Sequence, residues 1–179
     1  MIQKLIPLCL LLLSILACEV SVGVQDANVP AANAPVSNNA AVIIGDTAVV
    51  TQVIDGDTID VNINGTEQRV RYIGVNTPER DEVCFQEASN ANAALVQGQT
   101  VTLVRDVSET DRFGRLLRYV YANGVNVNEQ LVAQGYAEGV EYEPDTAQTA
   151  HFRDLEVQAR AANLGCHPTG IFNDGSSVR

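Results

Sequence analysis

Positive charge is scarce in this sequence. Its 179 residues carry 22 Asp and Glu against 11 Lys and Arg, which gives a formal net charge of −11. The one lysine, Lys4, lies near the start of the chain, so arginine supplies every later permanent cation. A chain with this balance has little general affinity for polyanions, because neutralisation of phosphate by basic residues dominates such binding. Any polyanion site must therefore be a local cluster of arginines.

Histidine is equally scarce, and the sequence has no internal repeat. His151 and His167 are the only two histidines, and they are not at the spacing of zinc ligands. The sequence therefore predicts neither a zinc site nor a histidine nucleophile.

The one long apolar run lies at the start of the chain. Lys4 precedes an almost wholly apolar stretch at 5–16, and Ala17 and Cys18 follow it. Such a segment is a secretory signal and is too short to span a membrane. Its end, Ile-Leu-Ala-Cys at 15–18, resembles the lipobox of bacterial lipoproteins, which implies cleavage before Cys18 and acylation of that residue. The alternative is an ordinary signal peptide with an incidental cysteine.

These features predict four parts: a lipoprotein signal peptide at 1–18, a flexible linker at 19–46, one domain at 47–172 and a tail at 173–179. A lipid anchor at Cys18 predicts an extracytoplasmic location on a bacterial cell membrane. Export to an oxidising compartment favours a disulfide between Cys84 and Cys166. The alternative for this pair is two free thiols.

The domain reads as a run of strands with helices after and between them. Alternation predicts strands at 48–54, 58–63, 67–75, 100–104 and 115–121, and Asn-Gly at 64–65 predicts a hairpin between the second and third. Helices are predicted at 85–97, from 126 or 128 to 134, and at 146–163. This order suggests an α+β, mainly β fold: a five-stranded OB-fold Greek-key barrel with about three packed helices.

Clusters of acids, amides, hydroxyls and arginines follow several of these strands. They are Asp-Gly-Asp-Thr at 55–58, Arg71 with Asn-Thr-Pro-Glu at 76–79, and Asp-Arg-Phe-Gly-Arg at 111–115. Together with 128–132 and 135–137, they resemble the staphylococcal-nuclease-like family in order and spacing over about 48–168. The resemblance implies an OB barrel with three helices and calcium-dependent endonuclease cleavage of DNA and RNA that leaves 3′-phosphates. We expect single-stranded or frayed substrates, and a monomer.

The resemblance also implies a calcium (Ca²⁺) site. Asp57 and the backbone carbonyl of Thr77 would be ligands, and calcium accepts carboxylate, carbonyl and water oxygens. For Asp57 alone, the alternative is an acid that caps a turn. Asn76 stands where the family usually has aspartate. It keeps an oxygen for the metal but loses a charge, so the sequence predicts weaker calcium binding.

Three charged residues receive catalytic roles by the same resemblance. Glu79 would be the general base that takes a proton from the attacking water. Arg71 and Arg115 would clamp phosphate, since a guanidinium donates two parallel hydrogen bonds to its oxygens. Taken singly, Glu79 also fits a surface acid and each arginine also fits a surface salt bridge.

Tyr142 is a candidate for stacking on a base, with core packing as the alternative. Two other functions stay open at this point. One is a non-catalytic nuclease-like module that binds nucleic acid or protein on a surface lipoprotein, and the other is an acidic lipoprotein with a structural role.

Overall fold

The computed structural model of this protein describes residues 43–173. The predicted signal peptide, Cys18, most of the predicted linker and all but the first residue of the predicted tail lie outside that range. No helix within 43–173 is long and apolar enough to cross a membrane.

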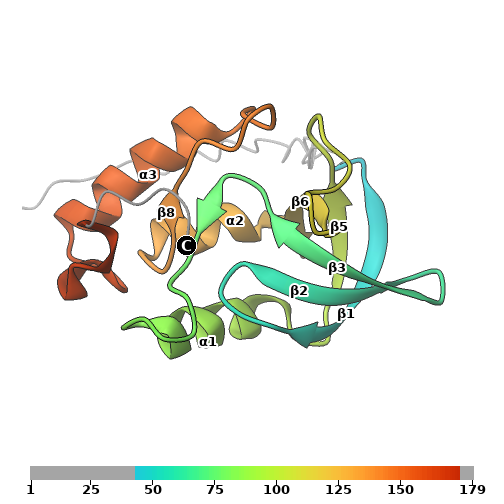
Figure 1. Ribbon diagram of the computed structural model, residues 1–179, viewed down its shortest axis with the longest axis horizontal. Coiled ribbons are helices and arrows are strands. Elements are labelled where there is room, and N and C mark those ends of the chain that lie inside the picture. The colour runs from blue at the N-terminus through green and yellow to red at the C-terminus, as the bar shows by residue number, and fades with distance from the viewer. Residues whose placement is uncertain (1–42, 174–179) are drawn as a thin grey trace, which may run out of the picture. The chain divides into compact units, whose positions relative to one another are not determined.

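A closed β-barrel forms the centre of the described domain (Figure 1). Its strands are β1 (Asp46–Val53), β2 (Thr58–Ile63), β3 (Thr66–Tyr72), β5 (Thr100–Val104) and β6 (Leu116–Ala122). Antiparallel pairing runs from β3 through β2, β1 and β5 to β6, and a parallel pairing of β3 with β6 closes the sheet. The predicted five-stranded OB-type barrel is confirmed.

Three helices pack on the barrel, as the sequence predicted. They are α1 (Phe85–Val96), α2 (Val127–Ala133) and α3 (Thr149–Ala161), and α2 contacts both of the others (Figure 1). Phe152 of α3 is fully buried and meets the ring of Tyr119 edge-on, with the ring centroids 6.1 Å apart. Short elements complete the fold: β7 (Val125–Asn126) and two 3₁₀ turns (His167–Thr169, Ile171–Asn173).

The third strand is shorter than the alternation predicted. It ends at Tyr72, because Gly74 has a φ of +73° that breaks the extended run. A Cβ at Gly74 would also lie 3.1 Å from the Phe152 ring. The chain then forms β4 (Val75–Asn76), which pairs with β8 (Glu138–Gly139) in a separate two-stranded sheet. The sequence pattern does not predict this pairing, which brings β8 beside the polar segment at 76–79.

A disulfide joins Cys84 to Cys166, the two cysteines for which pairing was predicted. Cys84 immediately precedes α1, and Cys166 immediately precedes the first 3₁₀ turn. The bond therefore ties the chain that follows the 76–79 segment to the end of the domain.

A buried asparagine joins α1 to the barrel. The side chain of Asn92 is fully buried, donates to the backbone carbonyl of Asp55 over 2.9 Å and accepts from the Tyr72 hydroxyl over 2.9 Å. Both contacts run from helix α1 to the barrel, and the bond to the Asp55 carbonyl holds the turn at 55–58. Asn92 therefore supports the position of the acids in that turn.

Replacing this asparagine should destabilise the domain. Asn92→Leu keeps the side-chain size but leaves the Asp55 carbonyl and the Tyr72 hydroxyl buried without partners, at about 1–3 kcal/mol for each group. We expect urea denaturation to show a loss of about 2–4 kcal/mol, with a smaller loss for Tyr72→Phe. A loss below about 1 kcal/mol in Asn92→Leu would show that water replaces these contacts.

Candidate active site

A cleft of about 760 Å³ on the domain is lined by most of the side chains predicted to form the site. These side chains come from the β1–β2 turn, from β3 and β4, from the segments after β4 and β8, and from the segment before β6. They are Asp57, Arg71, Asn76, Glu79, Arg115 and Tyr142. The structure thus brings together residues that are up to 85 positions apart in the sequence (57 to 142).

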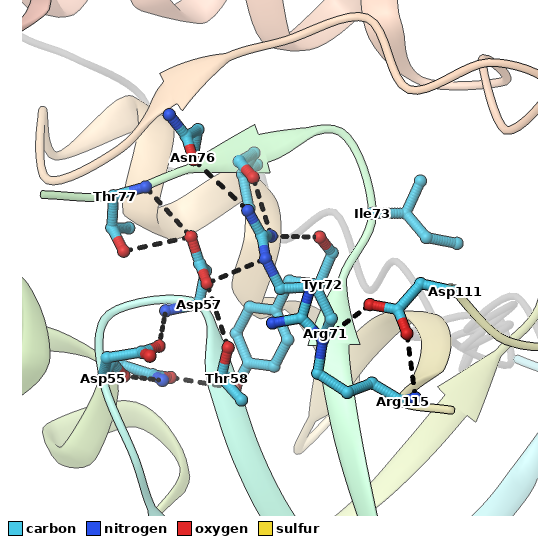
Figure 2. Close-up of polar contacts among 12 residues, drawn as sticks. Asp55, Asp57, Thr58, Arg71, Tyr72, Ile73, Asn76, Thr77, Asp111 and Arg115 are labelled. Atoms are coloured by element: carbon cyan, nitrogen blue, oxygen red, sulfur yellow. Dashed lines mark hydrogen bonds and ion pairs between the residues drawn. The ribbon is translucent and has the colours of Figure 1, made fainter. Parts of the chain in front are cut away.

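Asp57 lies at the centre of the polar contacts beside the cleft (Figure 2). Its Oδ2 accepts from the backbone N–H and from the hydroxyl of Thr77, both over 3.0 Å. Its Oδ1 accepts from the Thr58 hydroxyl and pairs with Nε of Arg71, both over 3.1 Å. The turn needs Gly56, because a Cβ there would lie 2.6 Å from Oγ1 of Thr77. One buried carboxylate therefore joins the β1–β2 turn, β3 and the segment after β4.

Arg71 is held by two backbone carbonyls and two side chains. Its Nη1 donates to the carbonyls of Tyr72 (2.6 Å) and Val75 (2.9 Å), and its Nη2 donates to Oδ1 of Asn76 (3.3 Å). With Nε on Asp57, these contacts leave a single N–H, on Nη2, without a partner among the described residues. A phosphate in the cleft would receive one hydrogen bond from this arginine in the observed arrangement, not the two that the sequence predicted.

Arg115 keeps more of its donors. Its Nε pairs with Oδ2 of Asp111 over 2.6 Å, and its side chain is 28% exposed. No contact within the described residues uses its Nη1 or Nη2 as hydrogen-bond donors. The terminal edge of this guanidinium therefore remains available for two parallel hydrogen bonds to a phosphate.

Glu79 lines the cleft, and its carboxyl group lies near the negative charge of other acids. Partial burial raises the pKa of this carboxyl above its ordinary value, and the charge of Asp57 raises it further. Arg71 and Arg115 act in the opposite direction on the same pKa. A carboxylate whose pKa is moved toward neutral pH is a better general base.

Asp55 is a cleft residue to which the sequence analysis gave no role. Burial and then the charge of Asp57 raise the pKa of the Asp55 carboxyl to about 6. The sequence does contain a signal for Asp55, because it is the first acid of the Asp-Gly-Asp turn at 55–57. Only the second acid of that turn, Asp57, was predicted to be a site residue. Its carboxylate accepts from the backbone N–H of Asp57 over 3.1 Å.

The donors at the cleft fit a hard cation. Asp55, Asp57 and Glu79 bring carboxylate oxygens to one region. Burial and then the charge of Asp57 raise the pKa values of Asp55 and Glu79, and a nearby divalent cation would favour their charged forms. No group of three or more His, Cys, Asp or Glu within 43–173 is already arranged around a metal position. Each oxygen of Asp57 already accepts two contacts, so a cation on Asp57 would replace or share one of them.

Comparison with known proteins gives the family. A family model described as staphylococcal nuclease homologue matches residues 69–166, more than half of the chain. The chain is 33% identical to thermonuclease of Staphylococcus intermedius over 136 residues, which are 73% of this chain and 81% of that protein. The chain belongs to the staphylococcal nuclease family.

Two further relatives have similar identities. Thermonuclease of Staphylococcus hyicus is 36% identical over 117 residues, which are 62% of this chain and 69% of that protein. Endonuclease YncB of Bacillus subtilis (strain 168) is 40% identical over 121 residues, which are 63% of this chain and 57% of that protein. The chain therefore spans less than two thirds of the length of the Bacillus relative.

Asn76, the predicted departure from the family's aspartate, has a specific partner. It lies opposite Glu138 in the β4–β8 pair, and its Nδ2 donates to Oε1 of Glu138 over 2.9 Å. Both side chains are buried. Since a guanidinium only donates, Arg71 requires Oδ1 of Asn76 on its side, and the amide NH₂ group then faces Glu138. An aspartate at 76 would instead place two buried carboxylates against each other.

Tyr142 fits both of the roles that were considered for it. It lines the cleft, and it also packs, partly buried, against the main hydrophobic core. Nearby, Oδ1 of Asp145 accepts from the backbone N–H groups of Val107 and Ser108 over 2.8 and 2.7 Å. This carboxylate ties the segment that carries Tyr142 to the loop before β6.

The Asn76 contact leads to a test that needs no metal. In a chelator, Asn76→Asp should lower the free energy of unfolding by about 1–3 kcal/mol, because the lost hydrogen bond to Glu138 and the repulsion between the two acids outweigh the stronger contact of the new carboxylate with Arg71. Asn76→Asp/Glu138→Gln should recover most of that loss, relative to Glu138→Gln alone, since glutamine can donate to the new carboxylate. Equal losses with and without Glu138→Gln would show that the two side chains are not coupled.

Proposed function

We propose that this protein is a calcium-dependent endonuclease that hydrolyses phosphodiester bonds of DNA and RNA and leaves 3′-phosphates. One observation carries the proposal: Asp57, Glu79, Arg71 and Arg115 meet at a single cleft. Family membership supports it, as do the relatives, which are thermonucleases and an endonuclease by name.

The arginines bind and orient the phosphate. Arg115 donates two hydrogen bonds from its terminal edge, and Arg71 donates one from Nη2. Because Asp57 and Asp111 fix the Nε atoms, both guanidiniums are held in place before substrate arrives. Fixed donors of this kind stabilise charge that develops on phosphate oxygens in the transition state.

Glu79 acts as the general base. It takes a proton from a water molecule whose oxygen attacks phosphorus, the bond from phosphorus to the 5′ oxygen breaks, and that oxygen takes a proton from solvent. Asp57, Asp55, Oδ1 of Asn76 and the Thr77 carbonyl would hold the calcium ion. When bound, the ion supplies positive charge that polarises water and a phosphate oxygen.

The cellular setting is also a proposal. We infer a monomer that is anchored by lipid at Cys18 to a bacterial cell membrane and lies outside the cytoplasm. The Cys84–Cys166 disulfide supports an oxidising compartment, where such bonds persist. Growth of bacteria with a radioactive fatty acid tests this proposal: the membrane-bound parent should carry the label and Cys18→Ala should not, and label in both or in neither would contradict the anchor.

Glu79→Gln should lower cleavage of denatured DNA by about 10²–10⁴-fold, because the amide cannot accept the proton of the attacking water. Parent protein should lose activity in a chelator and regain it with calcium. Glu87→Gln, which changes an exposed acid of α1 outside the cleft, serves as the control and should cleave like the parent. Binding of DNA without calcium-dependent cleavage by the parent would favour the non-catalytic module instead.

Arg115→Lys keeps the charge but loses the paired donors. We expect kcat to fall by about 10²-fold or more with a much smaller change in KM, since these bonds strengthen in the transition state. Arg105→Lys, at an exposed pair with Glu109, is the matched control. A change confined to KM would show that Arg115 binds ground state and transition state equally.

A further inference from the structure

Phe113 is an exposed aromatic residue beside the cleft. Its side chain is 68% exposed, and it is the only aromatic among the large hydrophobic residues that are exposed in the described part of the chain. Single exposed hydrophobic residues are common and usually need no explanation. Three features set this one apart: a rigid turn, flanking arginines and a hollow on each side.

The turn that carries Phe113 is held by four hydrogen bonds. Oδ1 of Asp111 accepts from the backbone N–H groups of Phe113 (2.8 Å) and Arg115 (3.0 Å). The backbone of Asp111 exchanges two more bonds with Gly114 and Arg115. Gly114, at a φ of +79°, allows the chain to close in this way. The ring is therefore presented to solvent by an ordered loop.

Two guanidiniums lie against the ring. The central carbons of Arg112 and Arg115 are 4.7 and 5.4 Å from its centroid, at distances typical of cation–π contacts. Arg112 makes no ion pair or hydrogen bond within 43–173, so its planar group is free to shift or to extend the stacking surface. Nucleobases stack on aromatic rings and on arginine planes alike.

Phe113 and Arg115 also line a second hollow, of about 450 Å³, next to the catalytic cleft. The second hollow includes two acids, Asp60 and Glu67, and two arginines, Arg69 and Arg115. Asp60 and Arg69 neutralise each other through bonds of 2.7 and 2.9 Å. Because acids and arginines are equal in number here, the second hollow does not attract a second phosphate. It suits a neutral, planar group that carries hydrogen-bond donors and acceptors.

The pairing of charges across the described domain also favours an uncharged contact with the substrate. Seven arginines in the described residues are in ion pairs with Asp or Glu, so little positive surface is left to follow a phosphate backbone. Of the arginines that line the cleft, Arg112 alone has no such pair within 43–173, but one arginine cannot follow a strand, so most of the binding beyond the scissile phosphate must come from uncharged contacts. Stacking of bases on aromatic side chains is the contact that serves this purpose in single-strand binding.

We propose that Phe113 is a stacking platform for one nucleobase of a single-stranded substrate, next to the phosphate held by Arg115, with the second hollow receiving that base. This inference rests on the proposed nuclease function. It restricts the substrate to strands whose bases are unpaired at this position, because a base within a duplex is already stacked and paired.

Fluorescence tests the platform directly, because the chain has no tryptophan. Phe113→Trp in a Glu79→Gln background, with calcium present, is titrated with hexathymidylate and with a hexamer that lacks bases. We expect saturable quenching by the first oligomer and none by the second. Val157→Trp, at an exposed position of α3 outside both hollows, should report no quenching. Equal quenching by both oligomers, or by neither, overturns the proposal.

Kinetics give an independent readout. Phe113→Leu keeps an apolar side chain without a ring, and we expect its KM for hexathymidylate to rise about tenfold with kcat nearly unchanged. On a hexamer that lacks bases on either side of one cleavable bond, parent and Phe113→Leu should have equal KM. An unchanged KM for hexathymidylate in Phe113→Leu overturns the platform.

These results separate the two proposals. Cleavage by the parent without base-dependent quenching or a KM effect refutes the platform and leaves the nuclease. Base-dependent quenching without cleavage by the parent supports the platform and refutes the nuclease.

Discussion

The buried carboxylate of Asp57 is the interaction on which the site depends. It accepts hydrogen bonds from Thr77 and pairs with Arg71, and so fixes three segments of the chain relative to one another. Gly56 is needed for the same reason, since a side chain there would collide with Thr77. The contacts that close this end of the barrel also position the acids and the arginine, so fold and site share one set of bonds.

This arrangement concentrates negative charge at a place that a cation and a phosphate can share. Asp55 and Glu79 both have raised pKa values, and Asp57 contributes to each shift. The second aspartate that the resemblance implies is absent here, and Glu138, on the neighbouring strand β8, is a second buried acid of this region besides Asp57. Glu138 lies outside the cleft lining and accepts the hydrogen bond of the Asn76 amide. If the proposed cation binds here, an amide at position 76 offers it one carboxylate fewer than aspartate would.

Much of the barrel and of the cleft could be predicted from sequence, because alternation, an Asn-Gly turn and three polar clusters are local signals. The β4–β8 pair could not, since each strand has two residues and shows no periodicity. The use of Arg71 donors by the carbonyls of Tyr72 and Val75 depends on the bend at Gly74, which a pattern of residue types does not encode. Asp55 and Phe113 were both inside recognised clusters, but their roles depend on burial by distant segments and on the shape of the neighbouring surface.

The central claim is that the oxygens around Asp57 hold one calcium ion beside the two arginines. Calorimetric titration of calcium into the protein tests it most directly, with Asp57→Asn as the comparison and circular dichroism as the check on folding. The account predicts one ion per parent chain, tighter in the presence of a nucleotide that carries phosphate, and no detectable binding to folded Asp57→Asn. Calcium binding of equal affinity in both proteins, or none in the parent, would contradict it.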